Sequence, residues 1–351
     1  MDNFKNIDTA IEDTKRLRQE GSSGAEGNIL YLLASGGYND VWLISPPYQD
    51  AERYVLRIPK QGTLLPDQIR NEVAFLTFVK KKLLSVPVPK VLSHSLDGKT
   101  WPTPFIAEEF MDGERLSSVW ATYDEPTKLA VAHQIAEIIV ELAETTSTGI
   151  GGLMLEHELG PTVEGMKLSK GRDKFHSPLC YDIGPYTSTK DYVLANYQKE
   201  IHYYLYAPEE DIDFSFFEKV SKDAFIMTLQ DERYDLLDND NAFLPEEPFV
   251  LVHGDLHGRN ILTKGGRVQA VLRWQFAGFY PLSELLGCTG VDVLEVKDDE
   301  DKVENNKWSD LIVKLAGERA KSRGWDERKV GLLLGDGDPK LHKTRIEMVP
   351  R

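Results

Sequence analysis

The segment that most constrains the fold of this 351-residue chain runs from Leu251 to Leu262 and reads LVHGDLHGRNIL. Apolar residues open and close the segment, which predicts two buried strands, and the polar stretch between them predicts a tight turn. The turn holds Asp255 and Asn260 five positions apart. This spacing suits a carboxylate that accepts a hydroxyl proton beside an amide oxygen that binds a metal on a nucleotide phosphate. The alternative is an aspartate that only fixes the turn.

The pattern His-x-Asp-x-x-x-x-Asn resembles the catalytic loop of kinases. Its form here, His-Gly-Asp-Leu-His-x-x-Asn from His253 to Asn260, resembles that of the aminoglycoside phosphotransferase and choline kinase-like family. The resemblance implies an α+β, two-lobed protein kinase-like fold, with a small antiparallel-sheet N-lobe and a large, mainly helical C-lobe. It also implies that ATP lies between the lobes, that Asp255 is the catalytic base, and that His253 holds the turn.

The next segment departs from the family at the residue that should hold magnesium. The family carries Ile/Leu-Asp-Trp-Glu-x-Ala-Gly, whereas residues 271–281 read VLRWQFAGFYP. Arg273 stands at the aspartate position and Gln275 at the glutamate position, while Trp274 is retained and is expected to pack beneath the catalytic loop. Magnesium needs hard oxygen ligands, and a guanidinium has no acceptor atom. Arg273 therefore cannot ligate magnesium, and Asn260 is the metal ligand that the motif keeps.

Three interpretations of Arg273 stay open. The first is an ATP-dependent phosphotransferase that acts on a small-molecule hydroxyl, in which Asn260 keeps one magnesium ion and Arg273 takes over part of the phosphate charge. The second is a catalytically impaired pseudokinase that works as a binding or scaffold protein, and the third is a different activity in the retained cleft. An engineered, inactivating substitution is a further alternative. If Arg273 points into the cleft, its charge lowers the pKa of Asp255 and makes that carboxylate a poorer base.

The predicted nucleotide-binding residues begin in the N-terminal part of the chain. Gly36 and Gly37 join two predicted strands, and glycines let backbone N–H groups approach phosphate oxygens closely, although a plain turn is the alternative. Arg57 lies in an apolar strand, where an arginine can grip phosphate with two hydrogen bonds. The resemblance implies that Arg57 pairs with Glu72 on the following helix. The alternative is that Arg57 faces solvent, in which case Lys60 is the substitute candidate for the phosphate-binding residue.

The linker between the lobes is predicted near Asp112. Backbone groups from Glu109 to Met111 would read adenine just before it. The predicted domains are an N-terminal helical extension (1–24), the N-lobe (25–112) and the C-lobe (113–351). Periodicity and turn residues predict strands at 28–33, 41–44, 53–58 and 105–111, helices at 67–84, 126–142, 192–206, 214–229 and 308–319, and an acidic loop at 297–301.

Charge and composition narrow the partners. The formal net charge of −16 argues against a general nucleic-acid or anionic-membrane binder. Only two cysteines occur, and no apolar run reaches membrane-spanning length, so a cytoplasmic protein is expected. The acceptor is unknown. Acidic residues before the catalytic strand would either attract a cationic acceptor, such as an amino sugar, or form a solvated loop; these are Asp231, Glu232, Asp235, Asp238 and Asp240.

Overall fold

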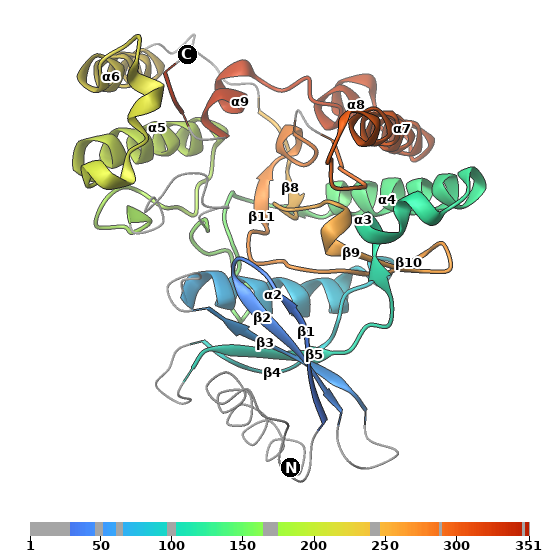
Figure 1. The fold of residues 1–351 in the computed structure, drawn as a ribbon. Coiled ribbons are helices and arrows are strands. Elements are labelled where there is room, and N and C mark those ends of the chain that lie inside the picture. The colour runs from blue at the N-terminus through green and yellow to red at the C-terminus, as the bar shows by residue number, and fades with distance from the viewer. Residues whose placement is uncertain are drawn as a thin grey trace.

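The computed structural model describes residues 29–45, 52–60, 66–96, 103–163, 175–238, 246–287, 290–345 and 348–350. The chain forms a small lobe built on an antiparallel sheet and a large, mainly helical lobe (Figure 1). This is the α+β, two-lobed fold that the resemblance predicts. The predicted N-terminal helical extension (1–24) lies outside the described residues. Within the described part of the chain, no helix is both long and apolar enough to cross a membrane.

The small lobe is a five-stranded antiparallel sheet in the order β1-β2-β3-β5-β4 with one helix against it. Its elements are β1 (Ile29–Ser35), β2 (Asn39–Ser45), β3 (Tyr54–Pro59), α2 (Pro66–Lys82), β4 (Val91–Ser95) and β5 (Phe105–Glu109). Side chains alternate between the two faces of the sheet. On β5, Phe105 and Ala107 join one apolar cluster, whereas Ile106 packs with Ile69 of α2. The same alternation on β3 turns Arg57 toward α2.

The chain enters the large lobe at Asp112, whose Oδ2 lies 2.5 Å from Lys264 Nζ. The elements that follow are β6 (Glu114–Arg115), α3 (Leu116–Val119), α4 (Glu125–Glu144), β7 (Thr146–Ser147), α5 (Thr189–Tyr206), α6 (Lys222–Asp238), β8 (Phe249–Val252), β9 (Ile261–Lys264), β10 (Arg267–Val271), β11 (Gly278–Pro281), α7 (Asp299–Ser322), α8 (Glu327–Leu333) and α9 (Pro339–Arg345). Two small sheets, β10-β9-β6 and β11-β8-β7, flank the turn that carries Asp255.

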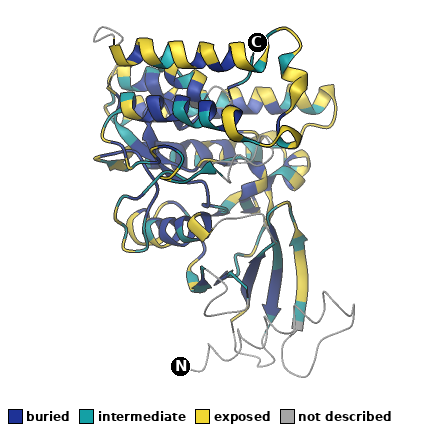
Figure 2. Cartoon of the chain, turned by 90° about the vertical axis from the view of Figure 1, so that its left-hand side faces the viewer, coloured by how far each residue is buried: buried dark blue, intermediate teal, exposed yellow. Residues whose placement is uncertain are grey.

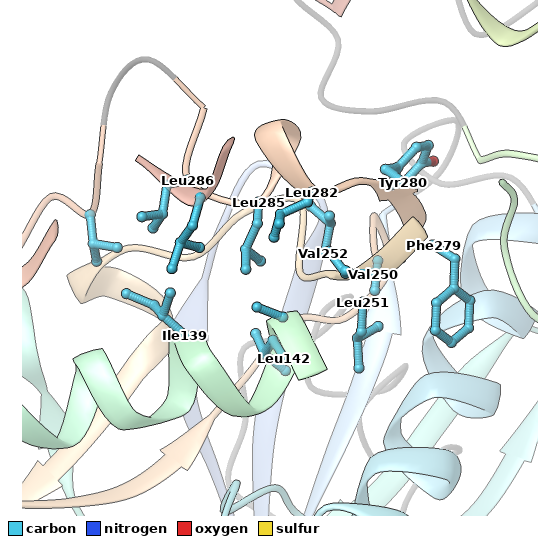
Figure 3. Close-up of a cluster of buried hydrophobic side chains, with 14 of the residues drawn as sticks. Ile139, Leu142, Val250, Leu251, Val252, Phe279, Tyr280, Leu282, Leu285 and Leu286 are labelled. Atoms are coloured by element: carbon cyan, nitrogen blue, oxygen red, sulfur yellow. The ribbon is translucent and has the colours of Figure 1, made fainter. Parts of the chain in front are cut away.

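The core of the large lobe lies directly behind this turn. Val250, Leu251 and Val252 of β8 pack between α4, which contributes Ile139 and Leu142, and the segment that follows β11 (Figure 3). Helix faces turned toward this core are buried and the outer faces are exposed (Figure 2). Burial of this many aliphatic side chains fixes β8, and therefore the start of the turn that carries Asp255, in one position.

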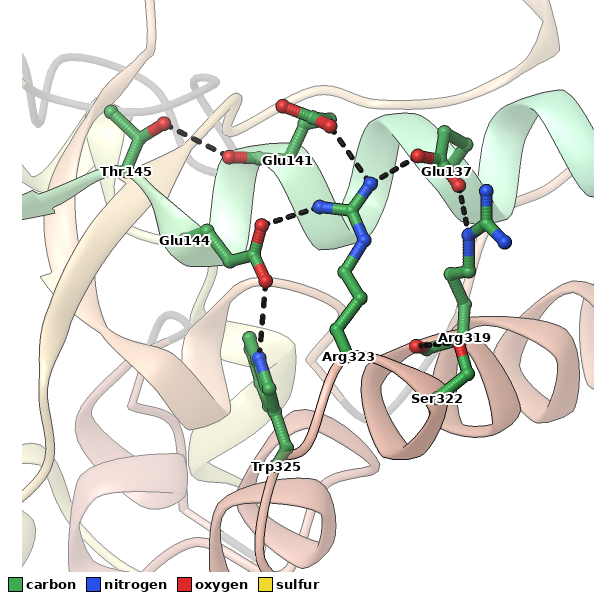
Figure 4. Close-up of polar contacts among 8 residues, drawn as sticks. All are labelled: Glu137, Glu141, Glu144, Thr145, Arg319, Ser322, Arg323 and Trp325. Carbon is green, nitrogen blue, oxygen red and sulfur yellow. Dashed lines mark hydrogen bonds and ion pairs between the residues drawn. The ribbon is translucent and has the colours of Figure 1, made fainter.

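Ion pairs close the outer side of the large lobe. Arg323, at the end of α7, contacts three glutamates one turn apart on α4: Glu137, Glu141 and Glu144 (Figure 4). Trp325 Nε1 also donates to Glu144 Oε1 at 3.2 Å. The spacing of the glutamates places them on one face of α4, so a single guanidinium can reach all three.

Three predictions about the helical part of the chain were wrong in part. The predicted helix at 214–229 begins later, because Phe214–Phe217 forms a short 3₁₀ helix and α6 begins at Lys222. The predicted acidic loop at 297–301 belongs largely to α7, where Asp298 caps the helix and accepts a hydrogen bond from Asp301 N–H at 2.8 Å. Acidic side chains favour a helix N-terminus, which a loop interpretation overlooks. In addition, α8 and α9 follow the helix that was predicted to be last.

Candidate active site

The turn between β8 and β9, which carries Asp255, depends on one glycine. Gly254 has a φ of +79°, and a Cβ at this position would lie 2.3 Å from the carbonyl oxygen of Phe276. Only glycine tolerates both the left-handed backbone and this close approach. The turn ends in a short 3₁₀ helix, Gly258–Asn260, which leads into β9. The sequence prediction of strand, tight turn and strand is confirmed.

Asp255 is buried, and both of its carboxylate oxygens are engaged. Oδ1 lies 2.8 Å from His257 Nε2, and Oδ2 accepts from Asn260 Nδ2 at 2.7 Å. His257 Nδ1 accepts from Arg259 N–H at 3.2 Å, so the proton of a neutral His257 lies on Nε2 and points at Asp255. Burial alone would raise the pKa of Asp255, but the hydrogen bond and charge of His257, with His253 and Asn260, outweigh it and lower the pKa. The carboxylate is therefore ionised at neutral pH.

His253 and Trp274 form the support beneath the turn. His253 is almost fully buried; its Nδ1 accepts from Asp255 N–H at 3.2 Å and its Nε2 lies 3.0 Å from the carbonyl oxygen of Leu272. Burial lowers the pKa of His253 to about 4, so the ring is neutral. Its ring meets that of Trp274 edge-on at 4.6 Å, and Trp274 Nε1 donates to Val271 O at 3.0 Å. These contacts agree with the structural roles that the sequence predicts for both residues.

Arg57 lies between two carboxylates in the small lobe. Its Nη1 and Nη2 donate to the two oxygens of Glu72 at 2.5 and 2.9 Å, and Glu108 Oε2 lies 3.6 Å from Nη1. The predicted pairing of Arg57 with Glu72 is thus present. Burial alone would lower the pKa of Arg57, but Glu72 and Glu108 outweigh it and raise that pKa above its ordinary value. Burial raises the pKa of Glu108 to about 7, against the charge of Arg57. Because Glu72 is fully buried, it would act on a ligand only through Arg57.

Helix α2 also holds the loop that follows β10. Glu72 Oε1 accepts from Trp274 N–H at 3.1 Å, across 202 positions of sequence. Asn71 donates to the carbonyl oxygens of Gln275 and Ala277 at 3.2 and 2.8 Å, and its Oδ1 accepts from Leu153 N–H at 2.9 Å. Sequence reasoning missed Asn71, because an asparagine next to a glutamate on a helix carries no local sign of distant backbone partners.

Arg273 crosses from the large lobe to the turn between β1 and β2. A Cβ placed on Gly36 would lie 3.5 Å from Arg273 Nη2, so the guanidinium reaches that turn. The backbone of Arg273 is left-handed, with a φ of +67°, which is unfavourable for a residue that has a Cβ. Burial, followed by the charge of Arg57, lowers the pKa of Arg273, while Asp255 works in the opposite direction. Among the described residues, Arg273 makes no hydrogen bond and no ion pair.

The residues present do not fit a magnesium site of the kind that the family resemblance implies. Asn260 Oδ1 is buried and has no hydrogen-bond partner in the described part of the chain, so it offers one oxygen ligand. The second position is the guanidinium of Arg273, which has no lone pair to offer. No group of three or more His, Cys, Asp or Glu side chains that could hold a metal ion occurs among the described residues.

The other predicted nucleotide-binding residues lie in the small lobe and at its end. The turn of Gly36 and Gly37 is closed by a hydrogen bond from Gly36 N–H to Asn39 O at 3.0 Å, and it packs over the large lobe through Tyr38, whose ring lies 5.9 Å from that of Phe276. Glu109 and Met111 lie at the start of the linker. The Glu109 side chain is turned outward to Lys80 and Lys90 N–H. A contact with adenine would therefore use the backbone, as the sequence analysis assumed.

The acidic residues predicted before the catalytic strand lie mostly on α6. Asp231, Asp235 and Asp238 are exposed, and Glu232 pairs with Lys343 at 2.5 Å. Asp240 lies outside the described residues. No contact joins these side chains to the catalytic turn within the described ranges, so the attraction of a cationic acceptor stays a prediction.

The sequence matches a known protein family. A sequence profile described as the phosphotransferase enzyme family, APH, matches residues 31–292, which include the turn of Gly36, Arg57 and the Asp255 turn. The chain belongs to this family. The match covers the small lobe and the large lobe as far as the segment before α7.

Among solved structures, one similar fold is a thermostable mutant of aminoglycoside phosphotransferase APH(4)-Ia in ternary complex with AMP-PNP and hygromycin B. It shares 17% identity, with a TM-score of 0.50, and the alignment covers 92% of this chain and 88% of that chain. At this identity the likeness concerns the fold alone.

Two curated relatives are altered inheritance of mitochondria protein 9, mitochondrial, from two fungi. The Candida glabrata protein is 33% identical over 90 residues, which is 24% of this chain and 14% of the relative. The Lodderomyces elongisporus protein is 33% identical over 116 residues, which is 30% of this chain and 18% of the relative. Each match spans less than a fifth of the relative's length.

Proposed function

We propose that this protein binds ATP between its lobes and transfers the terminal phosphoryl group to the hydroxyl of a small molecule. The observation that carries the proposal is the catalytic turn, in which an ionised Asp255 is held between His257 and Asn260 at the end of a buried strand. Family membership and a similar fold that holds a nucleotide analogue support it.

In this proposal Asp255 accepts the proton of the acceptor hydroxyl as the oxygen attacks the terminal phosphorus, and ADP leaves. A general base needs to be ionised and fixed within hydrogen-bond reach of that proton. The hydrogen bonds of Asp255 to His257 and Asn260 fix its orientation, although the lowered pKa makes it a weaker base. Arg57, held by Glu72, would position the phosphates from the small lobe.

A second candidate is a nucleotide-binding protein that transfers nothing. Arg273 favours it, because the guanidinium stands where the family resemblance puts a magnesium ligand and brings a positive charge near Asp255. Loss of a metal carboxylate removes charge stabilisation that phosphoryl transfer normally uses.

One experiment separates the candidates. ATP binding is measured by calorimetry and ADP formation is measured with a panel of hydroxyl acceptors, for the wild type, Asp255→Asn and the control Asp299→Asn, which changes an exposed residue of α7. The first candidate predicts that Asp255→Asn lowers kcat by about 100-fold or more while ATP binding and the control stay unchanged. ATP binding without turnover in any variant favours the second candidate. Absence of ATP binding in the wild type rejects both.

The acceptor and the cellular compartment are two further parts of the proposal. The acceptor is proposed as a small molecule with a hydroxyl group, and a cationic one remains a prediction. The cytoplasmic location also stays a prediction, and cell fractionation would test it against the mitochondrial location in the names of the fungal relatives.

A further inference from the structure

We infer that the cleft binds the phosphates of a nucleoside triphosphate in their metal-free form, with the guanidinium of Arg273 in place of a magnesium ion. The inference rests on the proposed nucleotide site and deepens it. It follows from the disagreement between the metal chemistry that the family resemblance implies and the residues that this chain supplies.

The first step is the charge of Arg273. A largely buried cation normally has a carboxylate partner, as Arg57 has in Glu72. Arg273 has no such partner among the described residues, although its five N–H donors form a fork suited to phosphate oxygens. Asp255 and Glu72 attract the guanidinium without forming an ion pair with it, so its N–H donors remain available to a bound anion.

The second step is the position of Arg273. Its Nη2 reaches the turn of Gly36, where a Cβ would lie 3.5 Å from it. The residue keeps a left-handed backbone that its Cβ disfavours, and strain of this kind persists where the surroundings fix it. Asn71 fixes these surroundings by holding the carbonyl groups of Gln275 and Ala277. The arginine is therefore presented by a rigid loop.

The third step is the effect on a metal. Arg57 and Arg115 add positive charge to the field at Arg273, whereas Asp255 and Glu72 add negative charge. A divalent cation carried in on the phosphates would meet the guanidinium of Arg273 at one of the two ligand positions that the family resemblance implies, and only Asn260 Oδ1 would remain of that pair. Metal-free ATP carries more negative charge than its magnesium complex, so it is the better ligand for this cleft.

The test is calorimetry of ATP, adenosine and inorganic tripolyphosphate with the full chain, in EDTA and in excess magnesium. The wild type is expected to bind ATP in EDTA at least as tightly as in magnesium, and to bind tripolyphosphate in EDTA. Arg273→Met is expected to weaken ATP binding in EDTA by about tenfold or more, with adenosine binding unchanged. Arg273→Lys should keep part of the affinity, and the control Arg328→Met, an exposed residue of α8, should keep all of it.

Arg273→Asp supplies the complementary variant, because it replaces the cation by the carboxylate found in the family pattern. Its ATP binding is expected to become dependent on magnesium. Wild-type binding of ATP that requires magnesium would overturn the inference and leave the nucleotide site standing. Unchanged metal-free binding in Arg273→Met, in protein with a wild-type circular dichroism spectrum, would overturn it as well. Wild-type protein that binds neither ATP nor adenosine in either buffer would instead reject the proposed function, and the inference with it.

Discussion

Removal of the buried arginine of the small lobe, Arg57, should cost more stability than removal of the partly exposed Arg323 of the large lobe. The perturbation is Arg57→Met, which keeps much of the side-chain volume and removes the charge. Arg57 is 6% exposed, and its partners Glu72 and Glu108 are 0% and 5% exposed, so water cannot replace the lost guanidinium. Two carboxylates would be left buried without a counter-charge.

The magnitude follows from this geometry. Breaking a buried ion pair by removing one partner typically costs about 3–5 kcal/mol, because the remaining charge stays desolvated. Glu108 Oε2 lies 3.6 Å from Arg57 Nη1, and the pKa of Glu108 is already raised to about 7. Without Arg57, this carboxylate can therefore take up a proton, which limits its part of the stability loss. Glu72 accepts both short hydrogen bonds from Arg57, and it carries most of the cost. We therefore expect a loss of about 3–5 kcal/mol for Arg57→Met.

The assay is urea unfolding of the wild type, Arg57→Met, Glu72→Gln and the double variant at neutral pH. The double variant should be more stable than the sum of the single changes predicts, because it removes the orphaned charge. Arg323→Met is the matched control: Arg323 also contacts three glutamates, but its side chain is 24% exposed. Ion pairs that water reaches are worth about 1 kcal/mol or less each, so the three pairs of Arg323 together should be worth less than about 3 kcal/mol. A loss for Arg57→Met no larger than that for Arg323→Met would refute the reasoning.

Three further predictions concern Glu108, Gly254 and Asn71. The folded-state pKa of Glu108 is raised to about 7, so between about pH 4.5 and pH 7 the folded protein holds a proton that the unfolded chain has released, and this residue makes stability fall as pH rises through that window. In urea unfolding, Glu108→Gln should be more stable than the wild type by about 2–3 kcal/mol at pH 8 and by much less near pH 4.5. Gly254→Ala should lower the free energy of unfolding by at least about 2 kcal/mol in thermal unfolding, whereas Gly37→Ala, where a Cβ meets nothing within 4 Å, should lower it by less than about 0.5 kcal/mol. Equal losses for the two variants would contradict the strain argument. Asn71→Ala should lower the free energy of unfolding by about 2–4 kcal/mol and speed amide hydrogen exchange across residues 273–277, because it leaves buried backbone groups unpaired. Unchanged exchange would show that other contacts hold the loop.

Much of the fold could be predicted from local sequence. The apolar runs around Asp255 determine two buried strands and the turn between them, and the capping and periodicity of α4 determine its extent. The pairing of Arg57 with Glu72 was also predictable from the family resemblance. The short strands β6 and β7 were missed because two residues carry no periodic signal, and β4 was missed because its five residues, VLSHS, carry few apolar side chains.

The amino-acid sequence by itself determined that Arg273 cannot ligate magnesium, because the chemistry of a guanidinium is the same in any fold. Only the tertiary structure decided where that charge lies. Its approach to Gly36, its lack of a partner among the described residues and the support of its loop by Asn71 depend on contacts between lobes. Residues more than 200 positions apart make those contacts, and no local pattern encodes them.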